Sequence, residues 1–319
     1  MRRVKLGQIC EVVSGGTPKT NVEEYWNGEF NWITPAEIND NDYIISDTKR
    51  KITQLAIEKK KLPLLPKGTV LLSSRAPIGK VAITGKEMYC NQGFKNLICS
   101  DEICNEYLYW YLKSKKEYLN SLGRGATFKE ISKKIVENIE IKLPEIERQR
   151  KIVDKLKKVD KIIQRRKNQS RLLDVVVQAR FVEMFGDMLL NPMEWLEIKL
   201  DTLADVVSGI TKGRKVHDSG LIEVPYMSVS NVKEGYIDWT TVKTIMATEQ
   251  EIEQYRLMSK DVLMTEGGDP DKLGRGAIIE NPLKNCIHQN HVFRVRLSRT
   301  VVIPEYFEEY LQHQKAKRY

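Results

Sequence analysis

The alternation of apolar and polar residues predicts short strands and helices in the first part of the chain. Apolar runs bounded by Gly or Pro predict strands at residues 70–72, 81–83 and 139–143. Aromatic residues recur at helical spacing between residues 106 and 116, which predicts a helix with an aromatic face. Because strands and helices are mixed, we expect an α+β (mixed α/β) fold.

The pattern then occurs a second time. Lys5-Leu6 and the segment Val-Val-Ser-Gly at 12–15 recur 194 residues later, at Lys199-Leu200 and 206–209. Four further segments recur in the same order at offsets of 192 to 199 residues. A repeat of this length predicts two homologous domains in tandem. We expect these domains at residues 1–143 and 187–319, joined by a spacer at 144–186.

The spacer is predicted to be one long helix, because residues 145–183 contain neither Pro nor Gly and Gly186 follows. Its apolar positions alternate at steps of four and three residues, which is typical of a coiled coil. A helix of about 38 residues is roughly 57 Å long. We expect antiparallel pairing with a second helix of the same kind; packing against the neighbouring domains is the alternative. The predicted pairing positions are Ile152, Leu156, Val159, Ile163, Leu173 and Val177, and Arg166 and Ser170 interrupt this seam.

The second repeat ends at Tyr319, before the counterparts of residues 123–143 and of the long helix. The sequence therefore predicts a C-terminal truncation. It also predicts that the unpaired helix associates with another chain to give a dimer.

Composition narrows the class of protein. With 41% hydrophobic and 30% charged residues, the 319-residue chain is typical of a soluble globular protein with two cores. No apolar run reaches the roughly 18 residues of a membrane span, and no signal-peptide core follows Met1, so we expect a cytoplasmic protein. Five cysteines without C-x-x-C spacing or a nearby histidine pair predict reduced thiols and no metal site.

The charge balance points toward a polyanion. The net charge is +9, and residues 145–187 hold 12 Lys and Arg against 7 Asp and Glu. Such a basic segment favours nucleic acid as a partner. A solvated helix without a polyanion partner explains the charge equally well.

Motifs at the junction of repeat and helix suggest a family. They are Gly125-Ala126-Thr127, the segment Ile-Glu-Ile-Lys-Leu-Pro at 139–144 and the segment Glu-Arg-Gln-Arg-Lys-Ile at 147–152. This junction resembles that of specificity subunits of type I restriction-modification systems, in which a strand ending in Leu-Pro or Pro-Pro leads into a long helix. Lys5-Leu6-Gly7 and Val13-Ser14-Gly15-Gly16-Thr17-Pro18 also resemble that family, so the resemblance covers residues 4–313.

The resemblance implies a non-catalytic subunit with two target-recognition domains that read a bipartite double-stranded DNA target. It implies methyltransferase and restriction subunits as partners, and S-adenosylmethionine, ATP and Mg bound by those partners, with no cofactor in this chain.

The residues agree with a chain that lacks catalysis. No G-x-x-x-x-G-K-[ST] loop is present to bind ATP. Asn191-Pro192-Met193-Glu194 is similar to the start of an adenine methyltransferase motif, but it lacks the aromatic residue that stacks a flipped base, so a turn is predicted. The two carboxylates and lysine of residues 267–272 suggest a nuclease site. Because residues 74–77 of the first repeat hold no carboxylate, a variable loop is the better interpretation.

Base readout needs polar side chains that differ between half-sites on a common framework. Arg suits guanine, and Asn or Gln suits adenine, in the major groove. Candidate base contacts in the first domain are Thr34, Ser73, Ser74, Arg75, Lys80, Asn91, Gln92 and Arg124. In the second domain they are Ser228, Asn231, Thr265, Arg275, His288, Gln289, Asn290 and His291. Candidate phosphate contacts are Lys19, Lys212, Arg214 and Lys272. For each base-contact candidate an ordinary surface or turn role is the alternative.

A different class of function stays open. A non-catalytic tandem protein-interaction scaffold held by a coiled coil accounts for the long helix. It does not account for polar loops that diverge between two matched frameworks.

Overall fold

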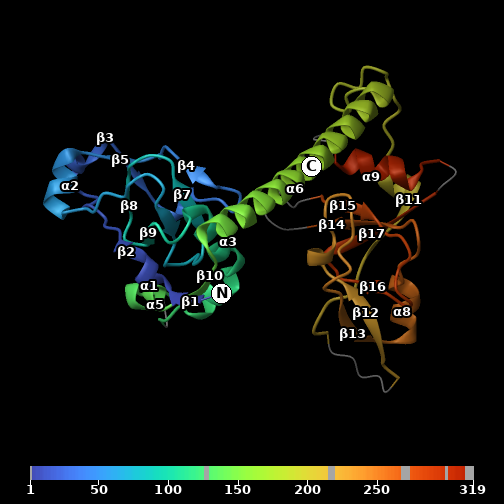
Figure 1. The fold of residues 1–319 in the computed structure, drawn as a ribbon. Coiled ribbons are helices and arrows are strands. Elements are labelled where there is room, and N and C mark those ends of the chain that lie inside the picture. Colours follow the sequence, from blue (N-terminus) through green and yellow to red (C-terminus); the bar gives the residue numbers. More distant parts are fainter. Residues whose placement is uncertain (1, 126–128, 215–219, 267–273, 299–300, 313–319) are drawn as a thin grey trace. The chain divides into compact units, whose positions relative to one another are not determined.

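The computed structural model describes residues 2–125, 129–214, 220–266, 274–298 and 301–312. The chain divides into two compact units, Met1–Lys167 (unit 1) and Asn168–Tyr319 (unit 2). Figure 1 shows mixed strands and helices in each unit, so the predicted fold class is confirmed.

Unit 1 is built on a five-stranded sheet of order β2-β9-β6-β7-β4 and a three-stranded sheet of order β5-β3-β8. A third pair, β1 with β10, joins the start of the chain to the strand before the long helix. The strands are β1 (Arg2–Lys5), β2 (Cys10–Ser14), β3 (Trp26–Ile33), β4 (Ile44–Ile45), β5 (Lys51–Ile52), β6 (Val70–Leu72), β7 (Val81–Thr84), β8 (Tyr89–Cys90), β9 (Lys95–Cys99) and β10 (Glu140–Leu143). The predicted strands at 70–72, 81–83 and 139–143 are therefore confirmed to within one residue.

In the described part of unit 1, five short α-helices and two 3₁₀ turns accompany the sheets. They are α1 (Leu6–Ile9), η1 (Glu23–Tyr25), η2 (Pro35–Glu37), α2 (Gln54–Lys60), α3 (Asn105–Ser114), α4 (Lys116–Ser121) and α5 (Lys133–Glu137). The helix predicted at 106–116 is α3. It buries Leu108, Tyr109 and Leu112 in the core, while its partly buried Tyr107 and Tyr111 donate hydrogen bonds to carbonyls of β10.

Unit 2 repeats this plan. A four-stranded sheet of order β11-β17-β14-β15 corresponds to β2-β9-β6-β7, and a three-stranded sheet of order β13-β12-β16 corresponds to β5-β3-β8. In both small sheets the last strand pairs in parallel, β8 with β3 and β16 with β12. The elements are α7 (Leu200–Leu203), β11 (Ala204–Ser208), β12 (Ile222–Met227), η3 (Val229–Asn231), β13 (Lys243–Ala247), α8 (Glu249–Tyr255), β14 (Val262–Thr265), β15 (Gly276–Ile278), β16 (Ile287–His288), β17 (Val292–Leu297) and α9 (Pro304–Gln312). The repeat seen in the sequence is thus a repeat of fold.

The long helix α6 (Ile146–Phe185) confirms the helix predicted at residues 145–183. It ends before Gly186, whose φ of +78° is the left-handed conformation that commonly closes a helix. Its start is anchored in unit 1 by the buried Gln149. The Gln149 amide oxygen accepts from the Cys104 N–H at 2.8 Å, and its Nε2 donates to the carbonyls of Glu102 and Pro144, both at 2.9 Å.

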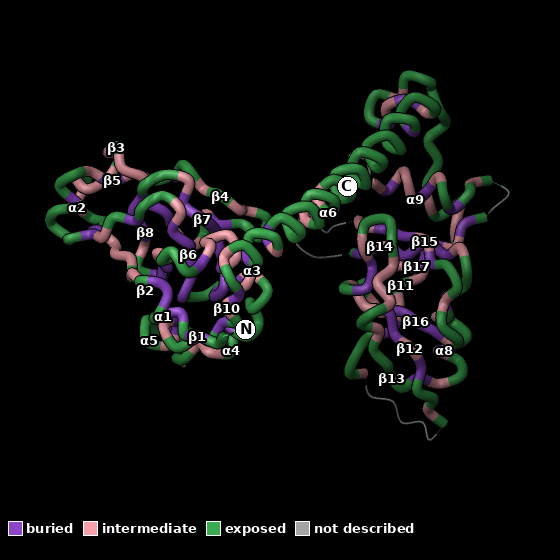
Figure 2. The backbone as a smooth tube through the Cα atoms, in the orientation of Figure 1, coloured by how far each residue is buried: buried purple, intermediate pink, exposed green. Residues whose placement is uncertain are grey.

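The end of α6 packs within unit 2. The rings of Phe181 and Phe185 lie 5.5 and 5.0 Å from that of Tyr306 on α9. Between its two ends the helix is exposed along most of its length, as Figure 2 shows. Leu156, Val159, Ile163, Leu173 and Val177 of the predicted seam are 37–60% exposed, and Ile152 is half-buried.

Candidate nucleic-acid interface

The candidate site is built on the same backbone turns in each unit. In unit 1 the Ser73 N–H donates to the Lys80 carbonyl at 2.9 Å, and the Ser74 N–H donates to the Gly93 carbonyl at 2.7 Å. In unit 2 the Thr265 N–H donates to the Arg275 carbonyl at 2.9 Å, and the Glu266 N–H to the His291 carbonyl at 3.1 Å. We call this pair of turns the shared frame: the turn after β6 or β14 and the turn after β8 or β16.

Several predicted side chains of unit 1 hold this frame together. Ser73 is buried, and its hydroxyl donates to the Pro77 carbonyl and accepts from the Lys80 N–H. The side-chain Oδ1 of Asn91 accepts from the Gly93 N–H at 2.7 Å, and its side-chain amide Nδ2 donates to the Thr17 hydroxyl at 3.0 Å. Thr34 caps η2 through Glu37. Their polar atoms are engaged within the chain.

Other predicted residues of unit 1 face solvent. Gln92, Arg124 and Arg75 are exposed. The Arg75 Nε donates to Glu130 at 2.9 Å, and the same carboxylate binds the Lys95 ammonium at 3.1 Å. Burial disfavours the charged form of Glu130, but the hydrogen bonds from Lys95 and Arg75 outweigh it and lower the pKa of this carboxyl. Ser74 is buried beneath this group, 3.5 Å from the Lys95 Nζ.

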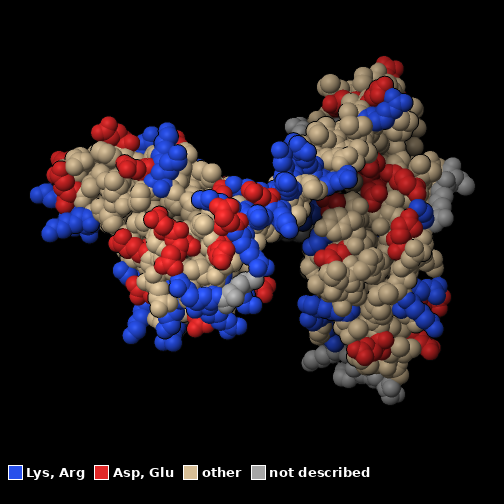
Figure 3. Space-filling view, viewed as in Figure 1, with Lys and Arg blue, Asp and Glu red and all other residues tan. Residues whose placement is uncertain are grey.

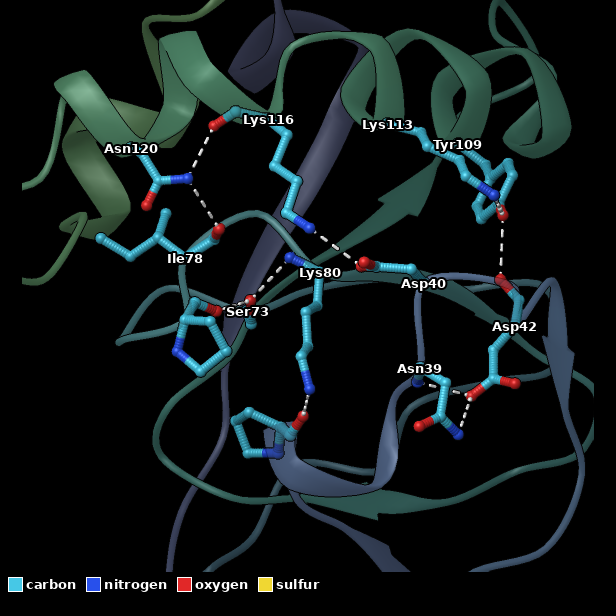
Figure 4. Close-up of polar contacts among 12 residues, drawn as sticks. Asn39, Asp40, Asp42, Ser73, Ile78, Lys80, Tyr109, Lys113, Lys116 and Asn120 are labelled. Carbon is cyan, nitrogen blue, oxygen red and sulfur yellow. Dashed lines mark hydrogen bonds and ion pairs between the residues drawn. The ribbon is translucent and has the colours of Figure 1, made fainter. Parts of the chain in front are cut away.

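Beside the frame, lysines from three segments gather around one loop (Figure 4). Lys116 from α4 pairs with Asp40 at 2.9 Å, and this hydrogen bond lowers the Asp40 pKa. The Lys80 ammonium donates to the Pro35 carbonyl at 3.1 Å. Lys113 from α3 donates to the Tyr109 hydroxyl at 2.8 Å. The loop between β3 and β4 is therefore bordered by three cationic side chains.

In unit 2 the frame presents different chemistry. His288 is buried: its Nδ1 lies 2.7 Å from the Val292 carbonyl, and burial lowers its pKa to about 4. Gln289 and Asn290 are half-exposed. His291 is exposed, and its Nδ1 lies 3.1 Å from the Glu266 carboxylate.

The remaining candidates of unit 2 lie at η3 or at the turn after β14. Ser228 caps η3 by donating to Asn231, and the buried Asn231 amide donates to the Asp238 carbonyl. Thr265 is buried and Arg275 is half-buried.

The four candidate phosphate contacts differ in availability. Lys19 and Lys212 are exposed. Arg214 makes two hydrogen bonds of 2.6 Å with Glu251, which lower the pKa of that carboxyl. Lys272 lies outside the described residues, as do the carboxylates of residues 267–272.

Three residues of this region were not predicted from the sequence. Glu266 directly follows the strand that matches residues 70–73, so extending that match by one position would have set it opposite Ser74. Lys95 and Glu130 carry no local signal, because they meet Arg75 only through folding.

The described residues show neither a membrane-spanning helix nor a metal cluster. No helix there is long and apolar enough to cross a bilayer. Nor do three or more His, Cys, Asp or Glu side chains in those residues cluster as a metal site would require.

Comparison with known proteins decides the family. Residues 1–170 match the family described as type I restriction modification DNA specificity domain. The chain belongs to this family. The predicted resemblance to type I specificity subunits is confirmed, and catalysis in type I systems lies in other subunits.

Relatives and solved structures extend this result. The MjaIX specificity subunit of Methanocaldococcus jannaschii is 41% identical over 186 residues, which are 57% of this chain and 43% of the relative. The MjaVIII specificity subunit of the same organism is 25% identical over 253 residues, 75% of this chain and 57% of the relative. The chain thus spans about half the length of these relatives.

Two solved structures have the same fold. One concerns complex assembly and conformational transition of the type I R-M system, with a TM-score of 0.57, 17% identity, and coverage of 99% of this chain and 80% of that one. The other is the type I S subunit from M. genitalium, with a TM-score of 0.51, 16% identity, and coverage of 99% and 77%.

Proposed function

We propose that this specificity subunit reads a bipartite double-stranded DNA target and directs methyltransferase and restriction subunits to it. In this proposal the domains at residues 1–143 and 187–319 each read one half-site. The spacer at 144–186 carries α6. S-adenosylmethionine, ATP and Mg are bound by the partner subunits, where methylation and cleavage take place.

The observation that carries the proposal is the shared frame. Both units keep the same backbone hydrogen bonds, yet the residues at the matched positions differ: Ser74 and Gly93 in unit 1, Glu266 and His291 in unit 2. Next to the unit 1 positions lie the exposed Arg75 and Gln92. Contacts to phosphates can be generic, whereas contacts to base edges must differ when two sequences are read. A constant backbone with variable polar side chains meets that requirement.

Charge and length agree with this reading. Figure 3 shows Lys and Arg side chains gathered over the middle of α6, and the three lysines around the Asp40 loop lie beside the frame of unit 1. A helix of 40 residues is about 60 Å long, between one and two duplex turns of roughly 34–36 Å. We therefore expect unread base pairs between the two half-sites.

The test is selection of duplexes from a random library by the full chain. We expect enrichment of two short half-sites at a fixed spacing. The scaffold alternative expects no sequence to be enriched. Enrichment of one continuous motif would contradict the division of reading between two units.

We also propose that α6 pairs antiparallel with α6 of a second copy. The seam spacing reads the same in both directions, so an antiparallel copy centred on residue 168 sets Val159 against Val177 and Ile163 against Leu173. Residues 150–167 hold nine Lys and Arg against two Asp, whereas residues 168–185 are neutral. Antiparallel pairing therefore keeps the two basic halves apart, and parallel pairing would bring them together.

A further inference from the structure

Arg75 is held in one orientation by a partly buried ion-pair network. Glu130 binds the Arg75 Nε with one carboxylate oxygen and the Lys95 ammonium with the other, at 2.9 and 3.1 Å. The Lys95 side chain is only 9% exposed, whereas that of Arg75 is 45% exposed. Backbone hydrogen bonds between Arg124 and Glu130, at 2.9 and 3.0 Å, fix the segment that carries the carboxylate. Glu130 is thus a fixed support, and Arg75 is the part that solvent reaches.

The network leaves a defined group for a ligand. Two cations share one carboxylate, so one positive charge is left over, and the exposed member is Arg75. Glu130 engages only its Nε; among the described residues neither Nη atom of Arg75 has a hydrogen-bond partner. The outer fork of the guanidinium is therefore free to make two parallel hydrogen bonds to a pair of acceptors.

The same frame in unit 2 presents the opposite kind of group. Glu266 takes the place of Ser74, since its N–H makes the corresponding bond to the turn after β16. Its side chain is 52% exposed and lies 3.1 Å from the His291 Nδ1, while His291 takes the place of Gly93. Because a carboxylate only accepts, His291 Nδ1 carries the proton, and among the described residues the second Glu266 oxygen is left to accept from a ligand.

We propose that the residues following β6 and β14 set base preference in each half-site: Arg75, oriented by Glu130, binds guanine, and Glu266, oriented by His291, binds cytosine. This inference rests on the proposed DNA-reading function. Guanine offers O6 and N7 as adjacent acceptors in the major groove, which suits the free fork of Arg75. Cytosine offers the N4 amine as a donor, which suits the free oxygen of Glu266. Glu130 and His291 act as positioning residues.

The experiment selects duplexes from a random library with the full chain and four variants. Arg75→Lys keeps the charge but cannot form the fork, so we expect guanine preference at one position of one half-site to fall about ten-fold or more. Glu130→Gln should reduce the same preference several-fold at the same position, without moving affinity for unrelated duplex. Glu266→Gln should change one position in the other half-site only.

Glu117→Gln is the matched control. It removes one exposed carboxylate of α4 whose side chain makes no hydrogen bond to the described residues. It should leave the base preference unchanged at every position of the selected motif. Thermal unfolding separates misfolding from altered readout, because Glu130→Gln leaves Lys95 buried without its partner. Arg75→Lys keeps the Glu130–Lys95 pair and tests the contact even if Glu130→Gln misfolds.

The outcomes distinguish failure of this inference from failure of the proposed DNA-reading function. If the wild-type chain enriches no motif, the proposed function fails and the inference fails with it. If a motif is enriched and keeps all its preferences in Arg75→Lys and Glu266→Gln, the inference alone is overturned. If Arg75→Lys loses guanine while a folded Glu130→Gln keeps it, the positioning role of Glu130 is overturned.

Discussion

Among single residues, the polar side chains beside the two sheets divide into those that hold the backbone and those that face outward. Ser73, Thr34 and Asn231 close turns through their own hydrogen bonds, whereas Arg75, Gln92 and His291 are exposed. An unpaired buried polar group is costly, so side chains of the first kind are constrained by folding. We therefore expect differences in base preference to arise from the exposed side chains.

His288 makes a testable case of such a constraint. Its Nδ1 hydrogen donates to the Val292 carbonyl, and its Nε2 is buried without a partner among the described residues. Burial is the main reason that its pKa falls from 6.5 to about 4, since the charged ring would leave a buried donor unpaired.

We expect unit 2 to lose stability in mild acid. The unfolded chain protonates His288 below about pH 6.5 and the folded chain only below about pH 4, so its contribution is complete above 6.5 and decreases toward 4. Between pH 7 and pH 5 the loss should be roughly 1–2 kcal/mol. Urea unfolding of the full chain at both pH values measures it. The variant His288→Cys carries the residue type found at the equivalent position, Cys90, and should lack this part of the pH dependence. If the free energy of unfolding changes equally with pH in the wild-type chain and in the variant, the assignment to His288 is refuted.

At this scale the sequence predicts which residue types can read bases but not which are free to do so. Ser73 and Arg75 looked alike as candidates, and only the fold buries one and exposes the other. The support of Arg75 by Glu130 joins residues 55 positions apart, and no periodicity reports such a contact.

Among elements, periodic patterns were reliable where one face or one seam is apolar. Strands β6 and β7 and helix α6 lie where the sequence predicts them, because bounded apolar runs and a four-three repeat are strong local signals. The parallel pairing of β8 with β3, and that of β16 with β12, is set by contacts distant in sequence. Those pairings could be recognised only in the structure.

The exposed seam of α6 leads to a prediction about association. Val159 and Ile163 are 53% and 45% exposed, and each lies opposite an apolar residue in the proposed antiparallel pair. The double substitution Val159→Asp and Ile163→Asp would bury carboxylates in that pair, so we expect the dimer to be lost.

Sedimentation at micromolar concentration checks this prediction. The wild-type chain should sediment as a dimer and the double variant as a monomer. Lys158→Asp with Lys161→Asp, at exposed positions of α6 outside the seam, controls for added negative charge and should stay dimeric. A wild-type monomer would contradict the pairing.

For the whole molecule, the duplication was visible in the sequence because the matched segments are core strands and frame turns that both units need. What diverged was less predictable. The same frame position holds Ser74 in one unit and Glu266 in the other, at the offset of 192 residues that the preceding strands share, but the two residue types give no sign that the positions match.

The net charge of +9 leads to a prediction about the salt dependence of DNA binding. Lys19 and Lys212 are exposed, one in each unit, and we expect both to contact phosphates. Changing both to Gln should lower the slope of log affinity against log salt by roughly 2 and leave the selected motif unchanged. Binding titrations at several salt concentrations measure this slope. The control variant Lys59→Gln with Lys60→Gln, at exposed positions of α2, removes the same charge and should alter the slope less. If the variant at Lys19 and Lys212 selects a different motif, these lysines contact bases and not phosphates.

The pairing of β1 with β10 has a consequence for how such a protein can change. Arg2 lies opposite Leu143 and Lys5 opposite Glu140, so the fold between these strands leaves and returns at neighbouring points. The segment between β1 and β10 therefore begins and ends at the same strand pair. Under the proposed function, genetic exchange of residues 6–139 would replace the whole first reading domain while keeping the strand that leads into α6, so one recombination event would supply a new target.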